Sequence, residues 1–369
     1  NAWKQRHLHN TLTRIGKLSA PLSPLISPES ESLGYRNRAL IPLLMEGSNL
    51  RLGYYRRGSH RIVNLNHCPV LDPRLDALIP EIKADLLSTG WVMDSDFRGK
   101  AGLRHLGLRI GVRTGDVLIS LISATEVLPG IDGLSERWIK RWPQVKGVTL
   151  NLQPRRSNTV LGEQTICLQG QDSIDEQFCG LKLELGTTTF FQVNTARAER
   201  AVVMICDWLS TSGEPLRVID AYCGIGTIAL PIAAHGHSVT GLEISSASIR
   251  HAQRNASRNN LQNTEFIDGD VIKHLQELLP HHDALVVDPP RKGLSPDVLA
   301  MILKQPPHRL AYLSCDPATL ARDLRELASD QGPYKIEAIQ PMDFFPQTSH
   351  LECLVLMRSI SCAAQPGTA

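Results

Sequence analysis

The second half of the sequence alternates short apolar runs with amphipathic stretches, and this alternation restricts the possible folds more than any other feature. Each apolar run is long enough for a buried strand, and the stretch after it carries apolar residues at helical spacing. A chain that repeats strand and helix in this way forms a parallel sheet with helices on both faces. The predicted strands are Leu216–Ala221, Ser238–Leu242, Glu265–Ile267, Ala284–Val287 and Leu310–Leu313.

The helices between these strands are predicted from capping residues as well as from periodicity. Ser295-Pro296 and Asp316-Pro317 each combine an N-cap residue with a first-turn proline, and Thr195 is predicted to cap an earlier helix. Leu351–Met357 has no helix after it, so we predict that it forms the antiparallel edge strand of the sheet. The other helices are expected from about Thr227, through Asn255 and over Val271–Leu279.

The domain boundaries are predicted from where the sequence pattern changes. A basic helix and a Pro/Ser-rich linker occupy residues 1–32, an α+β domain follows over residues 33–186, and the α/β domain occupies residues 187–369. The net charge of +2 restricts any nucleic-acid binding to a local patch. No stretch is long and apolar enough to span a bilayer, and the 8 cysteines lack paired spacing, so a cytoplasmic protein with reduced thiols is expected.

The α+β domain begins with two basic segments, Leu33–Ala39 and Leu50–Arg61, in which arginines alternate with tyrosines. Such segments suit phosphate contacts combined with base stacking. A solvated sheet face with aromatic cross-strand pairs explains the same pattern, and this stretch alone does not decide between the two. A helix is predicted over Pro73–Leu87.

A glycine-rich turn after the first strand of the α/β domain predicts a nucleoside site. Asp220–Thr227 reads D-A-Y-C-G-I-G-T, and Glu243 ends the next strand, where a carboxylate accepts hydrogen bonds from ribose hydroxyls. The turn lacks the features of a pyrophosphate site, so S-adenosylmethionine fits better. Asp270, after the third strand, is predicted to reach the adenine edge, and the less favoured alternative is a plain helix N-cap before Val271.

The loop Asp288–Gly293, D-P-P-R-K-G, ends the fourth strand at the edge of the sheet where ligands of α/β proteins bind. Methyltransferases that act on amino groups usually have an aromatic residue after such a D-P-P. Arg291 stands there instead, which argues against exocyclic amine chemistry.

Cys315 lies between the fifth strand and the helix that Asp316 begins. The dipole of that helix would favour a thiolate, and we therefore predict a nucleophile. The alternative is a small core residue, which is the commoner role of a cysteine. Cys223 and Cys353 are rival thiols, and both are expected to be structural.

Taken together, these segments resemble the RNA uracil-5 methyltransferases, which form 5-methyluridine. The resemblance is close over residues 190–358 and looser before them. It implies a Rossmann-like class I methyltransferase sheet preceded by an RNA-binding α+β domain. The motifs are Phe190–Asn194, Asp220–Thr227, Asp288–Gly293, Ser314–Pro317 and Phe345–Glu352.

The resemblance also implies roles for individual residues. Cys315 is expected to be the nucleophile that adds to C6 of uracil, and Glu352 the base that removes the C5 proton. His350 is an alternative base, because a spacing of two at the start of a strand would place it on the same face as Glu352. RNA cytosine-5 methyltransferases carry a Pro-Cys pair where this chain has Pro290-Arg291, so uracil is the expected base. Cofactor contacts are expected from Gln192, Tyr222, Thr227, Glu243, Asp270 and Asp288.

Within the family, residues 33–70 look like the branch that acts on 23S rRNA, and tRNA is the alternative substrate. Members of this branch often hold an iron–sulfur cluster with four cysteines. Cys68 matches the fourth position, but no cysteine precedes it, so we expect no cluster in the chain as given. An upstream TRAM domain is also expected to be absent, and the protein is expected to be a monomer. A small-molecule methyltransferase and an inactive RNA-binding protein are the other classes considered.

Overall fold

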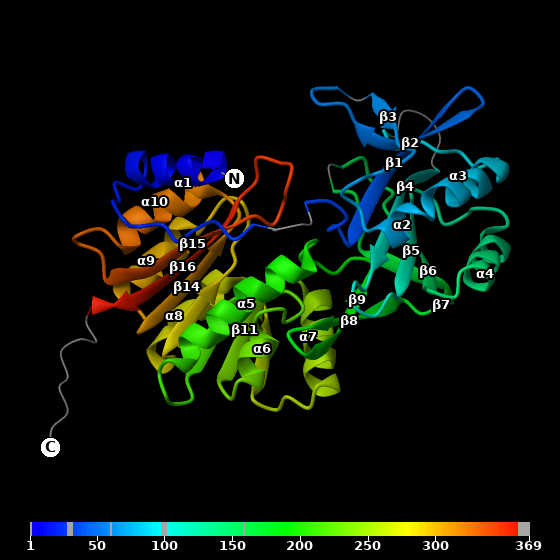
Figure 1. Cartoon of the computed structure of the whole chain (residues 1–369). Helices are drawn as coiled ribbons and strands as arrows, with labels where there is room; N and C mark the ends of the chain where they lie inside the picture. The colour runs from blue at the N-terminus through cyan, green and yellow to red at the C-terminus, as the bar shows by residue number, and fades with distance from the viewer. Residues whose placement is uncertain (1, 28–31, 60, 97–101, 158, 361–369) are drawn as a thin grey trace, which may run out of the picture. The chain divides into compact units, whose positions relative to one another are not determined.

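The computed structural model describes residues 2–27, 32–59, 61–96, 102–157 and 159–360. The chain forms two compact units (Figure 1). None of the helices within the described residues combines the length and the apolar character needed to cross a lipid bilayer. Unit 1 contains Asn1–Ser30, Phe178–Leu181 and Phe190–Ala369, and unit 2 contains Glu31–Gln177 and Lys182–Thr189.

A seven-stranded sheet forms the centre of unit 1, in the order β12-β11-β10-β13-β14-β16-β15. The strands from β12 to β14 are parallel to one another, and β16 is antiparallel to both of its neighbours. The predicted parallel α/β sheet is therefore confirmed. The strands are β10 (Arg217–Ala221), β11 (Ser238–Glu243), β12 (Thr264–Asp268), β13 (Ala284–Val287), β14 (Arg309–Ser314), β15 (Tyr334–Met342) and β16 (Glu352–Ser359).

Helices cover this sheet. Successive side chains of β10 point to opposite faces of the sheet, so two neighbouring residues show what packs against each face. Ile219 joins the apolar cluster that contains residues of α8, α9 and α10, and α1 packs on α10. The neighbouring residue Asp220 points to the opposite face, where it shares a pocket with residues of α5 and with Ile228, the N-cap residue of α6. The helices of unit 1 are α1 (Ala2–Arg14), α5 (Thr195–Ser210), α6 (Ala229–Ala234), α7 (Ser246–Arg258), α8 (Val271–Leu278), α9 (Pro296–Lys304) and α10 (Pro317–Leu327), with a 3-10 turn at Leu279–His281.

Two predictions for unit 1 are wrong in detail. The C-terminal strand β16 is antiparallel as predicted, but it is not the edge strand, because β15 pairs with its outer side. The alternation of side chains along β15 is interrupted by an irregularity between Ile336 and Ala338. The strand also needs β16 as its pairing partner. Helix α5 is capped by Asn194, whose side chain accepts from the N–H of Arg197 at 3.3 Å, and Thr195 is the first residue of the helix.

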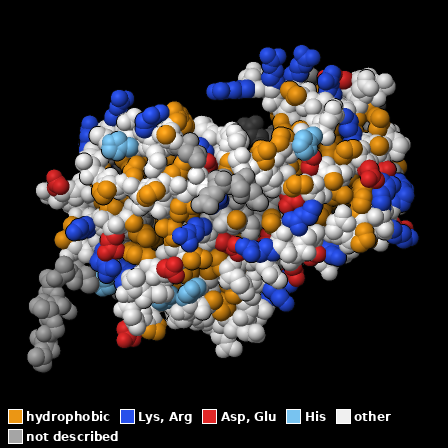
Figure 2. All heavy atoms as spheres, in the orientation of Figure 1, with side chains coloured by type: hydrophobic (Ala, Val, Ile, Leu, Met, Phe, Trp, Pro, Cys, Tyr) orange, Lys and Arg blue, Asp and Glu red, His pale blue; other side chains and the backbone are white. Residues whose placement is uncertain are grey.

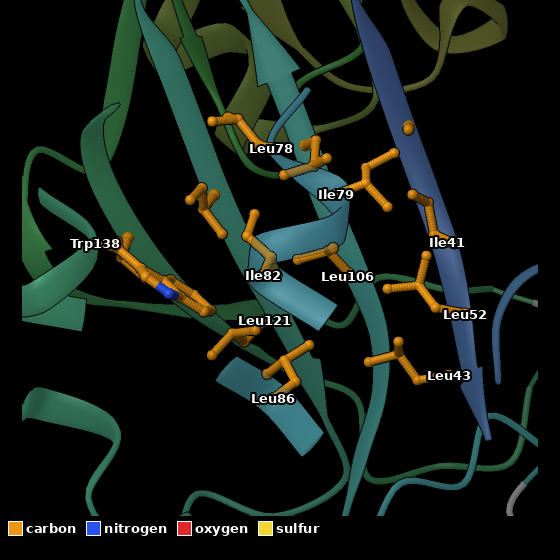
Figure 3. Packing of buried hydrophobic residues seen from close by; sticks show 14 of the residues in the cluster. Ile41, Leu43, Leu52, Leu78, Ile79, Ile82, Leu86, Leu106, Leu121 and Trp138 are labelled. Carbon is orange, nitrogen blue, oxygen red and sulfur yellow. The ribbon is translucent and has the colours of Figure 1, made fainter. Parts of the chain in front are cut away.

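Unit 2 is built on a second seven-stranded sheet, in the order β3-β2-β1-β4-β5-β6-β7. All neighbouring strands are antiparallel except β5 and β6, which helix α4 (Ile131–Arg141) connects. Figure 3 shows Ile79 on the side of Ile41, and Ile82 and Leu86 nearer to Trp138, all within the core of this unit. The strands are β1 (Arg38–Glu46), β2 (Asn49–Tyr55), β3 (Ile62–Asn64), β4 (Leu103–Ile110), β5 (Val117–Ser123), β6 (Val145–Leu152) and β7 (Gln164–Gly170), with a separate pair β8 (Ser173–Phe178) and β9 (Leu181–Gly186).

The helix predicted over Pro73–Leu87 is two helices, α2 (Pro73–Asp76) and α3 (Ile79–Ser88). Pro80 lies in the first turn of α3, where its missing N–H costs nothing. Inside one continuous helix its ring would clash with the carbonyl of Asp76, so the break falls just before it. The last helix of the unit is α4 (Ile131–Arg141).

Candidate active site

Cys315 lies in the short connection between β14 and α10. Asp316 caps α10 by accepting hydrogen bonds from the N–H groups of Ala318 (2.9 Å) and Thr319 (3.1 Å). Pro317 occupies the first turn of the helix, as predicted. Strand pairing on one side and the cap on the other therefore fix the backbone around the half-buried Cys315.

Glu352 is the first residue of β16 and only 3% exposed. In the antiparallel ladder, Ser314 lies opposite Cys353. Cys315 and Glu352 are each the next residue outward from that pair, so they face each other across the end of the ladder. Cys353 points the other way, into the apolar core of unit 1.

Acidic groups surround the sulfur of Cys315. Burial, followed by the charges of Glu352 and Asp288, raises the pKa of the Cys315 thiol to about 11, and Arg291 opposes this rise. Burial and Asp288 raise the pKa of Glu352 to about 8, and Arg291 again acts in the opposite direction. Burial raises the pKa of Asp288 to about 7, while a hydrogen bond from Gln192 lowers it. These mutual influences place Cys315, Glu352, Asp288 and Arg291 in one cluster.

The prediction that the helix dipole favours a thiolate at Cys315 is therefore wrong for this state of the protein. The first free N–H groups of α10 donate to Asp316 and not to the sulfur. The nearby carboxyl groups and the loss of water both favour the neutral thiol. The local sequence shows the helix but not the carboxyl groups that the fold brings beside it.

The loop that carries Asp288 and Arg291 is held by α10, the same helix that follows Cys315. The buried carboxylate of Asp323 accepts hydrogen bonds from the N–H of Leu294 (2.9 Å) and from the hydroxyl of Tyr312 (2.7 Å). Arg322 donates to the carbonyl groups of Lys292 and Leu294, both at 3.0 Å. Gly293 has a φ of +73°, and a Cβ there would lie 2.7 Å from Asp323 Oδ2, so only glycine fits. The loop therefore has a defined shape before any ligand binds.

The segment before β16 is anchored in a similar way. Lys4 Nζ of α1 forms a buried ion pair with Asp343 Oδ1 (2.7 Å) and also donates to the carbonyl of Phe345 (3.1 Å). Asn194 Nδ2 donates to the carbonyl of Phe344 (3.0 Å). Helix α1 thus contacts the segment that leads to Glu352, a role that the sequence did not suggest.

His350 does not share the position of Glu352. The strand begins only at Glu352, so the predicted common face does not exist, and His350 is exposed while Glu352 is buried. The His350 ring packs edge-on against Phe345 and lies 3.3 Å from Arg291 Nη2. His350 therefore belongs to the rim of the cluster.

A pocket beside this cluster brings together four of the six predicted cofactor residues. Gln192, Tyr222, Thr227 and Asp288 all line it. Gly224 also lines it, with a φ of +55°, and a Cβ added there would meet no atom within 4 Å. The space over Gly224 is therefore open to a ligand that approaches the backbone closely.

The other two predicted cofactor residues lie next to the pocket. Glu243 accepts hydrogen bonds from the N–H groups of Gly224 (3.2 Å) and Ser245 (2.8 Å), so it braces the glycine turn. Asp270 accepts from the N–H of Ile272 (3.1 Å) and is indeed the N-cap of α8. Its charge also helps to raise the pKa of Tyr222 to about 12, after burial as the main cause.

Asp220 is a pocket residue that the sequence analysis did not single out. Its side chain is fully buried, and neither oxygen forms a full hydrogen bond with a described residue, although the nearby N–H of Ala229 slightly favours the charged form. Burial and the charges of Asp288 and Glu243 raise its pKa well above the usual range. A buried carboxyl group without a partner is suited to a cationic ligand group. An acidic residue inside an otherwise apolar strand was the signal in the sequence.

Cys68 of unit 2 has no metal-binding surroundings in the described part of the chain. It is buried, and its N–H donates to Asp76 Oδ1 (2.7 Å), while the other Asp76 oxygen contacts His67 Nδ1. Among the described residues, no group of three or more His, Cys, Asp or Glu side chains could hold a metal ion. The described residues thus offer no further thiolates for a cluster at Cys68.

The chain is similar to known methyltransferases. Residues 273–360 match the family model described as tRNA (uracil-5-)-methyltransferase, and residues 218–292 match a methyltransferase domain. An uncharacterised RNA methyltransferase of Parasynechococcus marenigrum is 55% identical over 97% of this chain and 77% of its own length. A second one, from Synechocystis, is 42% identical over 97% of this chain and 77% of its own length.

A solved structure is similar over both units. The tRNA (uracil-54, C5)-methyltransferase of Pyrococcus abyssi, in complex with S-adenosyl-L-homocysteine, superimposes with a TM-score of 0.76 and 23% identity, covering 96% of this chain and 83% of that one. This likeness supports the fold, and the sequence relatives support the family. The chain therefore belongs to the RNA uracil-5 methyltransferase family.

Proposed function

We propose that this protein methylates C5 of a uridine in 23S rRNA, with S-adenosylmethionine as the methyl donor. The observation that carries the proposal is the pair of Cys315 and Glu352 at the end of one antiparallel ladder. Attack on C6 and removal of the C5 proton require a nucleophile and a base on the same reacting ring. The proposal assigns these roles to Cys315 and Glu352.

The reaction begins when the Cys315 thiol gives its proton to water and its sulfur forms a bond to C6 of uracil. Breaking the C5–C6 double bond places the electron pair as an enolate over C5, C4 and O4. S-adenosylmethionine would supply the methyl group that C5 then takes, and its sulfonium sulfur would leave as the thioether of S-adenosylhomocysteine. The carboxylate of Glu352 next accepts the C5 proton, the double bond re-forms, and the Cys315 sulfur leaves as a thiolate.

The raised pKa values fit this order of events. With a pKa of about 8, Glu352 is close to the operating pH, which suits a group that must accept a proton in one step and release it before the next turnover. Arg291 favours the charged forms of both Cys315 and Glu352. We assign to Arg291 the additional task of stabilising the enolate oxygen, because a guanidinium is a fixed donor for developing negative charge.

The residues of the pocket fit S-adenosylmethionine. Asp220 would bind the ammonium group of the methionine part, because its buried carboxyl oxygens have no other hydrogen-bond partner among the described residues. The open backbone at Gly224 would allow close approach of the same part, and Glu243 would accept hydrogen bonds from the ribose hydroxyls. Gln192, Tyr222, Thr227, Asp270 and Asp288 complete the proposed set.

Unit 2 is proposed to bind the RNA. The hairpin of β2 and β3 exposes Tyr54 and Tyr55, and Arg56, Arg57 and Arg61 near its tip. Figure 2 shows Lys and Arg side chains gathered at this tip, in the upper part of the view. Exposed arginines beside exposed tyrosines fit phosphate contacts and base stacking.

The resemblance of residues 33–70 to the 23S rRNA branch supports ribosomal RNA as the substrate. The same chemistry on a tRNA uridine is the second candidate, because the matching family model is described as tRNA (uracil-5-)-methyltransferase. Methylation assays on unmodified 23S rRNA and unmodified tRNA, both transcribed in vitro, would decide between them. A product found only in tRNA would reject the rRNA proposal and leave the chemistry intact.

The chemistry itself is tested with 23S rRNA transcripts that contain 5-fluorouridine. Fluorine does not leave as a proton does, so the covalent complex should persist through denaturing electrophoresis and map to Cys315 by mass spectrometry. Cys315→Ala should form no complex and should still bind S-adenosylmethionine, while Cys167→Ala, at an exposed site in unit 2, should react like the wild type. A complex mapped to Cys223 would contradict the assignment.

A further inference from the structure

Unit 2 contains a cavity of about 430 Å³ under the loop between β6 and β7. We propose that this cavity binds one unpaired nucleotide of the RNA substrate, distinct from the target uridine. The proposal rests on the proposed function, because it assumes that RNA is the substrate. The volume lies within the range of roughly 300–1,000 Å³ that is typical of sites for small ligands.

Two buried amide side chains hold the backbone of the described part of the loop over the cavity, residues 153–157 and 159–164. One belongs to β6, and the other belongs to the residue after it. Asn151 is 0% exposed and donates to the carbonyl groups of Gly162 (3.0 Å) and Gln164 (3.1 Å). The Asn151 carbonyl oxygen also accepts from the N–H of Gly162 at 2.7 Å. Gln153 Nε2 donates to the carbonyl groups of Thr159 and Leu161, both at 3.0 Å. A cavity framed in this way does not have to be ordered by its ligand.

A buried guanidinium supports the same loop from below. Arg104 of β4 is 4% exposed, and its Nη1 donates to the carbonyl groups of Gln153 and Arg155, both at 3.1 Å. Burial is the main cause that lowers the pKa of Arg104, and Asp94 is among the groups that oppose this effect. The hydrogen bonds to Arg104 thus hold the backbone at Gln153 and Arg155 against a buried side chain.

The lining of the cavity provides the three kinds of contact that an unpaired nucleotide needs. Arg155 contributes to the lining, and both it and its neighbour Arg156 are exposed, so they can reach a phosphate group. Leu152 and Leu161 give an apolar surface for the face of a base. Glu163 offers carboxylate acceptors for a 2′-hydroxyl or a base N–H. An unpaired nucleotide exposes its phosphate group, its 2′-hydroxyl and the face of its base together. A base inside a double helix keeps its face stacked against its neighbours.

The first test fills the cavity without changing the catalytic unit. Thr159 lines the cavity and is exposed, and its hydrogen bonds to other described residues use only its backbone. Thr159→Trp should therefore occupy the space without unfolding the loop. We expect it to raise the KM for 23S rRNA transcribed in vitro about tenfold, with kcat within twofold of the wild type. Gln169→Trp, at an exposed position of β7 outside the cavity, is the matched control and should leave both constants unchanged. An unchanged KM for Thr159→Trp would overturn the proposal.

The second test addresses charge. Arg155→Ala combined with Arg156→Ala should weaken equilibrium binding of the same RNA and reduce its salt dependence. Removal of Arg137, an exposed arginine of α4, by Arg137→Ala should have a much smaller effect. Equal losses in the two variants would mean that the loop contributes only general positive charge, and this would also overturn the proposal.

The third test separates this proposal from the proposed function. The RNA is transcribed with 4-thiouridine, irradiated in complex with the wild-type protein, and the crosslinked peptides are identified by mass spectrometry. Crosslinks within residues 153–164 support the cavity whether or not 5-methyluridine is formed. Crosslinks elsewhere in unit 2 with none in residues 153–164 would refute it, while a lack of methylation would count only against the proposed function.

Discussion

The reactivity of Cys315 toward an alkylating agent gives a direct test of the electrostatics at the proposed active site. A thiol with a pKa of about 11 is ionised to only ~0.03% at pH 7.5, since the thiolate fraction falls tenfold for each unit below the pKa. An ordinary cysteine, with a pKa of about 8.5, is ~10% ionised at that pH. In the absence of RNA, we therefore expect iodoacetamide to react with Cys315 on the order of 100-fold more slowly than with free cysteine.

The pH dependence sharpens this test. The rate at Cys315, followed by mass spectrometry of its peptide, should keep rising almost tenfold per pH unit up to about pH 10, because the thiol does not approach full ionisation below that pH. A rate that levels off below pH 8 would refute the reasoning, since it would mean that the N-terminus of α10 stabilises the thiolate despite the cap at Asp316.

The substitution Glu352→Gln isolates one cause of the raised pKa of Cys315, which is the charge of Glu352. Glu352 itself has a pKa of about 8, so its negative charge is present mainly above pH 8. The variant should therefore react faster than the wild type at pH 9 and nearly as the wild type at pH 6.5. Glu326→Gln, on the exposed face of α10, is the control and should have no effect at either pH. An equal acceleration at both pH values would indicate a structural change and not the loss of a charge.

Three other perturbations follow from buried charges. Asp220→Asn should weaken S-adenosylmethionine binding, measured by calorimetry, by about 10- to 100-fold, because a charge-assisted hydrogen bond is lost; unchanged affinity would remove Asp220 from the site. Lys4→Met should lower the free energy of unfolding, measured with urea, by roughly 3–5 kcal/mol, because Asp343 stays buried without its partner; a loss below ~1 kcal/mol would mean that water reaches the pair. Folding raises the pKa of Glu352, so its contribution to stability is full at low pH and is lost as the pH rises to about 8. Glu352→Gln should therefore raise the melting temperature at pH 9 and change it little at pH 4, and the reverse order would contradict the raised pKa.

The elements that sequence reasoning predicted correctly depend on local chemistry. Asp316 and Ser295 each cap the helix that they were expected to begin, because a capping bond joins residues only two or three positions apart. The parallel strands were visible because burial on both faces makes each one a continuous apolar run. Strand β15 was missed because its alternation is interrupted and its pairing partner, β16, comes later in the chain.

The features of the candidate site that sequence reasoning missed depend on residues that are far apart in the chain. The motifs indicated Cys315 and Glu352, but not that the carboxyl groups of Glu352 and of Asp288, in the loop after β13, would raise the pKa of the thiol. The sequence also placed His350 and Glu352 together, since it could not show where the strand begins. The importance of Asp220 and of Lys4 follows only from the fold. The fold places Asp220 in a pocket without a hydrogen-bond partner among the described residues, and it places Lys4 beside the buried Asp343.

The antiparallel pairing of β14 and β16 also limits how the protein can vary. Since successive side chains of a strand alternate between faces, a slip of one residue in this register would bring Cys353 or Leu351 to the place of Glu352. A deletion or insertion in residues 343–351 is therefore neutral only if the loop absorbs it before Glu352. The spacing between Cys315 and Glu352 is thus set by backbone hydrogen bonds, which most side-chain substitutions leave in place. The sequence around the proposed site can therefore change extensively while its geometry persists.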